Sequence, residues 1–464
     1  MARFFAGPLA LILSCAPAGS TGPSVEAGAA PEVTALPDPL TVYKSLDFIT
    51  GTHSFPAVGR FVYLPGPGDT TYAVLSLSFP ASALKFRREP PGLIAKYRIT
   101  ATIRDSVTTY HYLNQTEDVR VLTYRETSRS DESVFFQGFF KLRPGDYEAT
   151  LEVQDMASRA GFLADAQLSV PDFSREFVTA PLIAYRLQPR ADPAEPPSLI
   201  LSPRATIDMG GSPRIYVESR PGSAETLVIE LLTDAQLTWA DTLPLDSIPT
   251  PLYTNVANVP ADILAPGSAL TLRARLGAQV SESTSLLVAL GHEWIFVDHQ
   301  EMMSYLRYSG TPAQLDSLQN APPRERARRL HAFWQMRDPD PATPENEFFE
   351  AYFGRIQDAN DRFSQPGSPG WLTDLGAVYV TLGPPDEVFR HLELEPGPGS
   401  SQVWLYNRSL GFDVRLVFVD ESGVGGFGLT RDSRREFFQA VERIYSSSGA
   451  LGADPAESAE RLAR

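Results

Sequence analysis

Apolar and polar positions alternate with a period of two between residues 41 and 175, which is the pattern of half-buried β-strands. Residues 96–104 alternate without interruption, and residues 147–153 repeat the pattern after Arg143-Pro144-Gly145-Asp146. Proline fixes φ and glycine accepts a positive φ, so this pair suits the centre of a type II turn. We therefore predict an antiparallel, Ig-like β-sandwich over residues 41–175.

A second stretch of strand-like runs extends from residue 181 to residue 297. Pro-Gly pairs such as Pro221-Gly222 separate the runs, which favours a second antiparallel β-sandwich. We expect the Pro- and Ala-rich residues 189–197 to link the two sandwiches. The predicted strands are Arg214–Val217, Thr226–Leu232, Leu270–Leu276 and Ser285–Leu290.

Helical spacing replaces the period of two after Asp298. The apolar residues of 323–336 fall on one stripe, and Thr343-Pro344 supplies an N-cap residue and a proline for the start of the next helix. The pattern predicts a mixed α+β C-terminal domain over residues 298–430, followed by a C-terminal helix and a frayed tail over residues 431–464. The strands expected in this domain are Val378–Thr381, Val403–Tyr406 and Asp413–Phe418.

The first residues have the features of an export signal. One basic residue, Arg3, precedes an apolar run from Phe4 to Leu13, which is shorter than the roughly 20 residues that span a bilayer. The run ends at Ser14-Cys15 in a pattern similar to a bacterial lipobox. We interpret residues 1–14 as a signal peptide, Cys15 as a lipidated N-terminus and residues 15–40 as a flexible tether. A cleaved signal without lipidation is the alternative.

Composition narrows the classes of partner. The formal net charge is −16, and nucleic-acid binding requires a concentrated basic surface, so we expect no nucleic-acid partner. Four arginines between residues 324 and 329 are expected to form the solvated side of a helix, with a docking patch for an acidic partner or an anionic lipid as the alternative. Cys15 is the single cysteine, which excludes a disulfide within the chain. No second apolar run reaches 18 residues, so we expect no transmembrane span in the mature protein.

Three groups of residues in the third segment form an ordered series at residues 333–347, 359–363 and 370–387. In this order and spacing they resemble the GWxTD domain family, which has no established biochemical activity. The resemblance implies a bacterial exported protein in which this domain follows a signal sequence and β-rich modules. The motif residues, to which we assign a structural or binding role, are Trp334, Arg337, Asp338, Asn346, Asn360, Gly370, Trp371, Thr373, Asp374, Gly383 and Asp386.

Chemistry at these motifs has two interpretations. The carboxylates Asp338, Asp374 and Asp386 would suit general acid–base work if burial separated their pKa values. Each also stands where a cap or turn uses a carboxylate, and the nucleophile and phosphate motifs of common enzymes are absent from the sequence. His292 and His299 are seven residues apart without further zinc ligands nearby. We therefore predict no catalytic residue, metal or cofactor.

The leading hypothesis is a non-enzymatic exported protein that a lipid anchors in the cell envelope, at the outer membrane or in the periplasm. There it binds a protein partner. The alternative is a secreted hydrolase that acts on envelope polymers or peptides through the motif carboxylates. A third hypothesis is a glycan-binding sandwich in which Tyr110 and Tyr112 line a sugar site. Convergence of the carboxylates in one cleft would distinguish the hydrolase from the other two.

Overall fold

The computed structural model describes residues 38–447 with eleven short gaps, and the predicted signal peptide, Cys15 and most of the predicted tether lie outside the described residues. Pro39 and Leu40, which we placed at the end of the tether, instead begin helix α1 (Pro39–Ser45), capped by Asp38. No helix in the described part of the chain is long and apolar enough to cross a membrane. The gaps are 106–107, 130–133, 223–225, 246–251, 279, 291–293, 344–345, 366–367, 392–399, 422 and 424.

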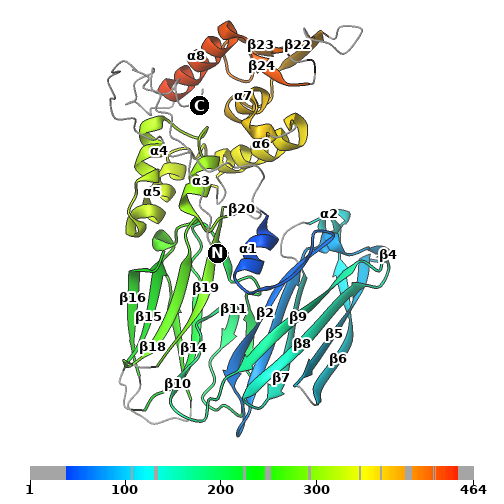
Figure 1. The fold of residues 1–464 in the computed structure, drawn as a ribbon, viewed down its shortest axis with the longest axis vertical. Helices are drawn as coiled ribbons and strands as arrows, with labels where there is room; N and C mark the ends of the chain where they lie inside the picture. Colours follow the sequence, from blue (N-terminus) through cyan, green and yellow to red (C-terminus); the bar gives the residue numbers. More distant parts are fainter. Residues whose placement is uncertain are drawn as a thin grey trace, which may run out of the picture. The chain divides into compact units, whose positions relative to one another are not determined.

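The first sandwich contains two antiparallel sheets (Figure 1). In one sheet the strand order is β1-β2-β3-β7, and in the other β5 pairs with β4, β6 and β8, while β8 pairs with β9. The elements are β1 (Ile49–Thr52), β2 (Phe55–Pro65), β3 (Thr71–Phe79), η1 (Ala81–Ala83), β4 (Arg87–Glu89), β5 (Gly92–Arg104), β6 (Thr109–Val121), α2 (Tyr124–Thr127), β7 (Val134–Leu142), β8 (Gly145–Asp155) and β9 (Gly161–Val170).

The second sandwich also has two sheets, and its pairs are antiparallel except for β13 with β19. One sheet has the order β10-β14-β11-β12, with β17 on β14; the other has the order β13-β19-β18-β15-β16, with β20 on β19. The elements are β10 (Phe177–Val178), β11 (Leu182–Gln188), β12 (Ser198–Leu201), β13 (Thr206–Asp208), β14 (Arg214–Arg220), β15 (Thr226–Thr233), β16 (Gln236–Pro244), β17 (Tyr253–Asn258), η2 (Ala261–Ile263), β18 (Leu270–Leu276), β19 (Val280–Leu290) and β20 (Trp294–Ile295).

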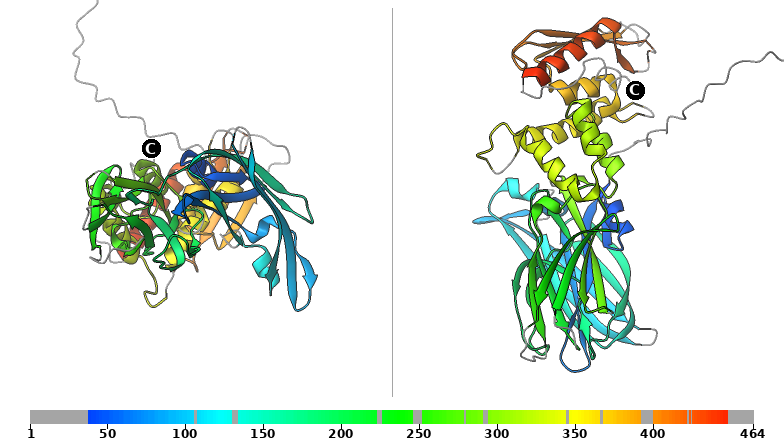
Figure 2. Two further views of the ribbon diagram at one scale, coloured as in Figure 1. Left: turned by 90° about the horizontal axis from the view of Figure 1, so that it is seen from below. Right: turned by 90° about the vertical axis from the view of Figure 1, so that its left-hand side faces the viewer.

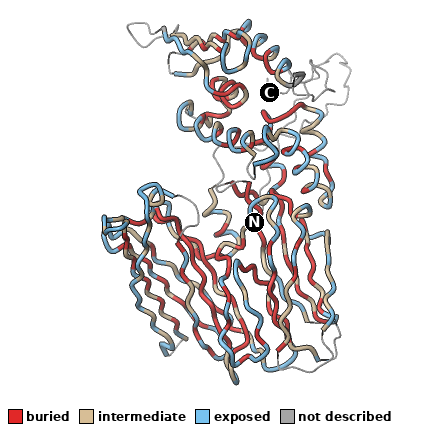
Figure 3. Tube along the Cα trace, turned by 180° about the vertical axis from the view of Figure 1, so that it is seen from behind, coloured by how far each residue is buried: buried red, intermediate tan, exposed pale blue. Residues whose placement is uncertain are grey.

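Alternation along the strands produces the two cores. The inward side chains of β5 are at most 2% exposed, while their outward neighbours reach solvent (Figure 3). Strands in both sandwiches have the usual twist of packed sheets (Figure 2). The two sandwich predictions are confirmed. The inward residues of β5 are Tyr97, Ile99, Ala101 and Ile103.

A third apolar cluster lies between β2 and β3 of the first sandwich and β11, β12 and β14 of the second. Its members come from the outer faces of the two facing sheets, so burial of these faces holds the sandwiches together. The buried residues are Val62, Leu64, Tyr72, Val74, Leu182, Leu199, Leu201 and Tyr216.

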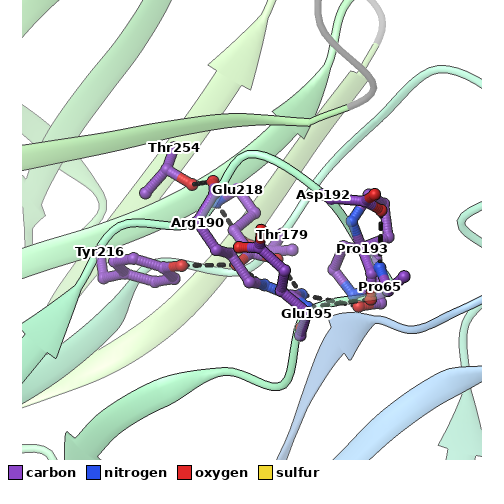
Figure 4. A network of polar contacts seen from close by, with 10 residues as sticks. Pro65, Thr179, Arg190, Asp192, Pro193, Glu195, Tyr216, Glu218 and Thr254 are labelled. Carbon is purple, nitrogen blue, oxygen red and sulfur yellow. Dashed lines mark hydrogen bonds and ion pairs between the residues drawn. The ribbon is translucent and has the colours of Figure 1, made fainter.

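The prediction that residues 189–197 link the sandwiches is wrong. These residues connect β11 to β12, which pair with each other inside the second sandwich. The guanidinium of Arg190 forms two bonds of 2.7 Å with the Glu218 carboxylate on β14 (Figure 4). It also donates to the carbonyl oxygen of Pro65 in the first sandwich at 2.6 Å, and Tyr216 donates to Glu218 at 2.5 Å. A buried cation makes this proline-rich connection part of the packed structure.

The C-terminal region combines helices with a small antiparallel sheet of order β21-β22-β23-β24, which confirms the α+β prediction. Its elements are α3 (His299–Tyr305), α4 (Pro312–Gln319), α5 (Pro323–Gln335), α6 (Glu347–Phe363), η3 (Gly370–Leu372), α7 (Asp374–Leu382), β21 (Glu387–His391), β22 (Ser400–Tyr406), β23 (Val414–Asp420), β24 (Phe427–Leu429) and α8 (Arg431–Ser447).

Two local predictions for this region are wrong. Residues 378–381 belong to helix α7 and not to a strand, because Thr373 caps the helix start and Gly383, with φ of 84°, ends it. The arginines of α5 are not simply solvated. Arg326 pairs with Asp234 in the β15–β16 turn, and Arg324 donates to the carbonyl oxygen of Leu237 at 2.8 Å. Helix α5 therefore docks on the second sandwich through its basic side.

Candidate functional site

The first motif group forms the corner between α5 and α6. Trp334 is 2% exposed and packs against four aromatic side chains of α6, the nearest at 4.9 Å between ring centroids. Asn346 accepts a hydrogen bond from the Phe349 amide at 2.9 Å and donates to the carbonyl oxygen of Trp334 at 2.8 Å. One asparagine thus caps α6 and ties it to the end of α5.

Arg337 and Asp338 continue this corner. The Arg337 guanidinium lies 3.7 Å from the centre of the Phe333 ring and donates to the carbonyl oxygen of Ser309 at 2.8 Å. It also donates to the Gln314 side chain at 2.5 Å, so it joins α5 to the start of α4. Asp338 accepts from the amide of Asp340 at 3.2 Å, which closes the turn that contains Pro339.

The second group brings α6, η3 and α7 into close contact. A Cβ atom on Gly370 would lie 2.0 Å from the carbonyl oxygen of Ala359, and one on Gly376 would lie 1.9 Å from that of Gly370. The Asn360 side chain accepts from the amide of Trp371 at 3.2 Å. Glycine at both positions is therefore a requirement of backbone contact.

Trp371 is fully buried and serves as a core residue. Its ring stacks on Tyr305 of α3 with 4.8 Å between centroids, and the Tyr308 ring meets it edge-on at 6.0 Å. Burial raises the pKa of Tyr308 to about 12, as expected in an aromatic environment. The tryptophan therefore joins η3 to α3.

Thr373 and Asp374 begin α7 and extend the contacts to the C-terminal elements. The Thr373 hydroxyl accepts from the Gly376 amide at 3.1 Å and donates to the carbonyl oxygen of Gly370 at 2.7 Å. The Asp374 carboxylate accepts from the Leu429 amide of β24 at 2.6 Å and from Arg434 of α8 at 2.7 Å. Five consecutive residues thus hold α3, α6, α7, β24 and α8 together.

Gly383 and Asp386 form the passage from α7 to the small sheet. The Gly383 carbonyl oxygen accepts from the Tyr406 hydroxyl at 3.0 Å. Asp386 accepts from three successive amides after β22, from Asn407 at 2.7 Å through Ser409 at 3.2 Å. The Asn407 N–H foremost, with its two neighbours, lowers the pKa of Asp386 below its ordinary value.

The three motif carboxylates are used at three different places. Asp338 serves a turn after α5, Asp374 serves β24 and α8, and Asp386 serves the β22–β23 connection. A general acid at neutral pH needs a raised pKa, and that of Asp386 is lowered. This arrangement has the character of structural carboxylates.

The remaining candidates are distributed elsewhere. His299 is buried on α3, with Nε2 at 3.2 Å from the Leu318 carbonyl oxygen, and burial lowers its pKa; His292 lies outside the described residues. No group of three or more possible metal-ligating side chains occurs in the described part of the chain. Tyr110 donates to Asp105 at 2.8 Å and meets the Tyr147 ring edge-on, while Tyr112 is 64% exposed.

The spacing of these residues has a counterpart among known families. Residues 279–444 match the model of the GWxTD domain. The chain contains a GWxTD domain. The match includes all of β19, the small sheet and the helices as far as residue 444 of α8, so it begins earlier than the predicted residue 298 and within the second sandwich. The resemblance inferred from the motif residues is confirmed.

Two solved structures show weak similarity to this chain. Trypsin-activated alpha-2-macroglobulin from Escherichia coli is 10% identical with a TM-score of 0.17, over 54% of this chain and 18% of that one. The fibronectin(III)-like modules of Clostridium thermocellum CbhA are 8% identical with a TM-score of 0.14, over 50% of this chain and 87% of theirs. No curated protein matches the sequence.

Sequence reasoning missed several residues that make contacts in the GWxTD junction, the set of contacts around residues 370–374, and elsewhere. Gly376 was available as a glycine inside an apolar run, a position that often indicates close backbone contact. Arg434 had no local signal, because its partner Asp374 lies 60 residues earlier. The Arg190–Glu218 pair was not predicted either, since Arg190 lies in a presumed linker and Glu218 lies just beyond the predicted strand Arg214–Val217.

Proposed function

We propose that this chain is a non-enzymatic, exported protein that is anchored in the cell envelope and presents its GWxTD domain and paired sandwiches to a protein partner. The observation that carries the proposal is the use of the motif side chains. Asp338, Asp374 and Asp386 are each engaged by backbone amides of separate segments. Trp334 and Trp371 are buried core residues. The motif residues therefore stabilise the fold of the domain.

Contacts between the segments support a scaffold role. The apolar cluster between the sandwiches, the Arg190–Glu218 pair and the contact of α5 with the β15–β16 turn join all three regions of the described chain. A scaffold that holds a binding surface at a defined position gains affinity because less conformational freedom is lost on binding.

The envelope anchor rests on the sequence alone. The apolar run before Cys15 and the presence of a single cysteine at that position are the supporting features. Such an anchor would hold the domains at a membrane surface through acyl chains and not through a spanning helix.

The test is a pull-down from gently solubilised native membranes with the intact chain and with Cys15→Ala. We expect the intact chain to fractionate with membranes and to recover a defined envelope protein, and Cys15→Ala to be released from the membrane. The purified chain should show no turnover of envelope polymers or peptides. Turnover that is abolished by Asp374→Asn or Asp386→Asn would instead establish the hydrolase.

A further inference from the structure

A cleft of about 500 Å³ lies where elements of both sandwiches meet the first strands of the GWxTD domain. Its wall includes Tyr43 of α1, Phe135 of β7 and Ile295 of β20. Ligand pockets in proteins have volumes of roughly 300–1,000 Å³, so this cleft is large enough for a small organic group. A ligand bound here would contact α1 and both sandwiches.

Two departures from regular backbone geometry border the cleft. The register of β11 with β12 shifts between Ala184 and Arg186, directly after the residues that pair with β14, and Tyr185 is left 45% exposed. Ala205 has a φ of 49° although it is fully buried, and it directly follows Arg204 in the cleft wall. Bulges and left-handed residues other than glycine concentrate at binding sites, because the chain needs them to aim side chains.

The floor and rim of the cleft are apolar. Ile183, Ala289 and Ile295 are buried side chains that supply the floor. Phe135 and Tyr185 meet edge-on at the rim with 5.7 Å between centroids, and both remain more than 40% exposed. An exposed aromatic pair above an apolar floor favours an aromatic or aliphatic ligand group.

The polar part of the wall is cationic. Arg204 and Arg214 contribute two positive charges and Asp208 one negative charge, in a chain whose net charge is −16. Arg214 is exposed and donates through Nη2 to the Tyr185 carbonyl oxygen at 3.0 Å. A guanidinium has five N–H donors in a planar fork, so this bond leaves donors that match a carboxylate. The neighbouring Asp208 disfavours a more highly charged anion such as a phosphate.

We infer that the cleft binds a carboxylate carried beside an aromatic or aliphatic side chain, as in an acidic, apolar segment of a partner protein. The apolar group occupies the floor between Ile183 and Ile295, and the carboxylate lies against Arg214. The assignment of this carboxylate to a protein rests on the proposed function. A free organic acid is the other source of the same chemistry.

Isothermal titration calorimetry on the purified full chain tests the cleft with two probes. N-acetylphenylalanine carries the carboxylate and the ring, and N-acetylphenylalaninamide carries the ring without the charge. We expect the acid to bind at least about tenfold more tightly than the amide, the usual size of a charge-assisted hydrogen bond. Equal binding of the two probes, or binding of neither, overturns the inference.

Three variants sharpen the assignment. Arg214→Gln should weaken the acid about tenfold and leave the amide unchanged, whereas Asp208→Asn should strengthen the acid. Arg186→Gln is the matched control, because Arg186 is an exposed arginine next to Tyr185 that does not line the cleft. An effect of Arg186→Gln as large as that of Arg214→Gln would contradict the site.

A pull-down with Arg214→Gln and Arg186→Gln separates this inference from the proposed function. If Arg214→Gln fails to recover the partner and Arg186→Gln still recovers it, the result supports both the inference and the proposed function. Equal recovery of the partner by the two variants overturns the assignment of the ligand to that partner and leaves the proposed function intact. Binding of the acid without any recovered partner overturns the proposed function and leaves a site for a free acid.

Discussion

The junction between the sandwiches and the junction around the GWxTD motif join distant segments by different means. Between the sandwiches, Arg190 and Glu218 are 3% and 0% exposed, and the guanidinium also donates to three carbonyl oxygens. In the GWxTD domain, Arg434 and Asp374 are 37% and 26% exposed. There the close contacts of Gly370 and Gly376 accompany the ion pair.

The difference indicates which kind of substitution should destabilise each junction most. A buried ion pair is favourable only when all its groups have partners, so loss of one charge leaves the other unpaired in a medium that solvates it poorly. A half-exposed ion pair retains water and contributes less. We therefore expect charge removal to disturb the sandwich junction most, and changes of shape to disturb the GWxTD junction most.

Glu218→Gln should have the largest effect. It leaves Arg190 buried beside a neutral amide, and breaking a buried pair costs about 3–5 kcal/mol. Amide hydrogen exchange should show faster opening of β11, β14 and the end of β2. Glu148→Gln is the control, because its ion pair with Arg104 is more than half exposed. Equal exchange in the two variants would contradict the importance of burial.

Gly370→Ala should have the next largest effect on stability. The added methyl group would lie 2.0 Å from the Ala359 carbonyl oxygen, and overpacking of this kind costs about 1–3 kcal/mol. Gly354→Ala lies on α6, the helix that carries Ala359, where it has open space, and it should instead stabilise the chain by roughly 0.5–1 kcal/mol. Thermal midpoints of the two variants should therefore move in opposite directions.

Thr373→Ala should have a smaller effect of about 1 kcal/mol, typical of a lost N-cap. The hydroxyl both accepts from Gly376 and donates to Gly370, so Thr373→Ser should restore most of the lost stability. Urea denaturation followed by the fluorescence of buried tryptophans would measure the change. A serine variant as unstable as the alanine variant would show that the methyl group matters more than the cap.

The pH dependence of Asp386 should be the smallest effect. Its pKa is lowered in the folded chain, so its contribution is complete above the ordinary aspartate pKa of about 4 and is lost as the pH falls through the folded value. The thermal midpoints of the wild type and Asp386→Asn should differ at neutral pH and converge in acid. A difference that persists in acid would contradict this role of the carboxylate.

Sequence patterns predicted those parts of the fold that depend on local rules. The alternation of β5 identified a half-buried strand. The helix expected to start at Thr343-Pro344 begins later, because Asn346 caps α6 and accepts from the amide of Phe349. The apolar run at 378–381 was assigned wrongly, because valines and a threonine favour strands in isolation and tertiary burial overrides that preference. Short apolar runs do not distinguish a buried helix from a strand.

The motif residues were found from their spacing, but their contacts were not. Asp374 could be placed at a cap or a turn, whereas its bonds to β24 and Arg434 depend on chain segments 55 and 60 residues away. The buried Arg190 was hidden for the same reason, since a proline-rich segment favours a linker when its partners are unknown.

The position of β19 limits where recombination could separate the GWxTD domain from the rest of the chain. The strand pairs with β18 and β13 inside the second sandwich, yet it belongs to the region that matches the GWxTD domain. A recombination event at the start of that region would remove a central strand from one product and leave the other with an unpaired hydrophobic strand. Exchange of the GWxTD domain in this chain therefore requires a recipient whose sandwich lacks one strand, or transfer of the sandwich with it.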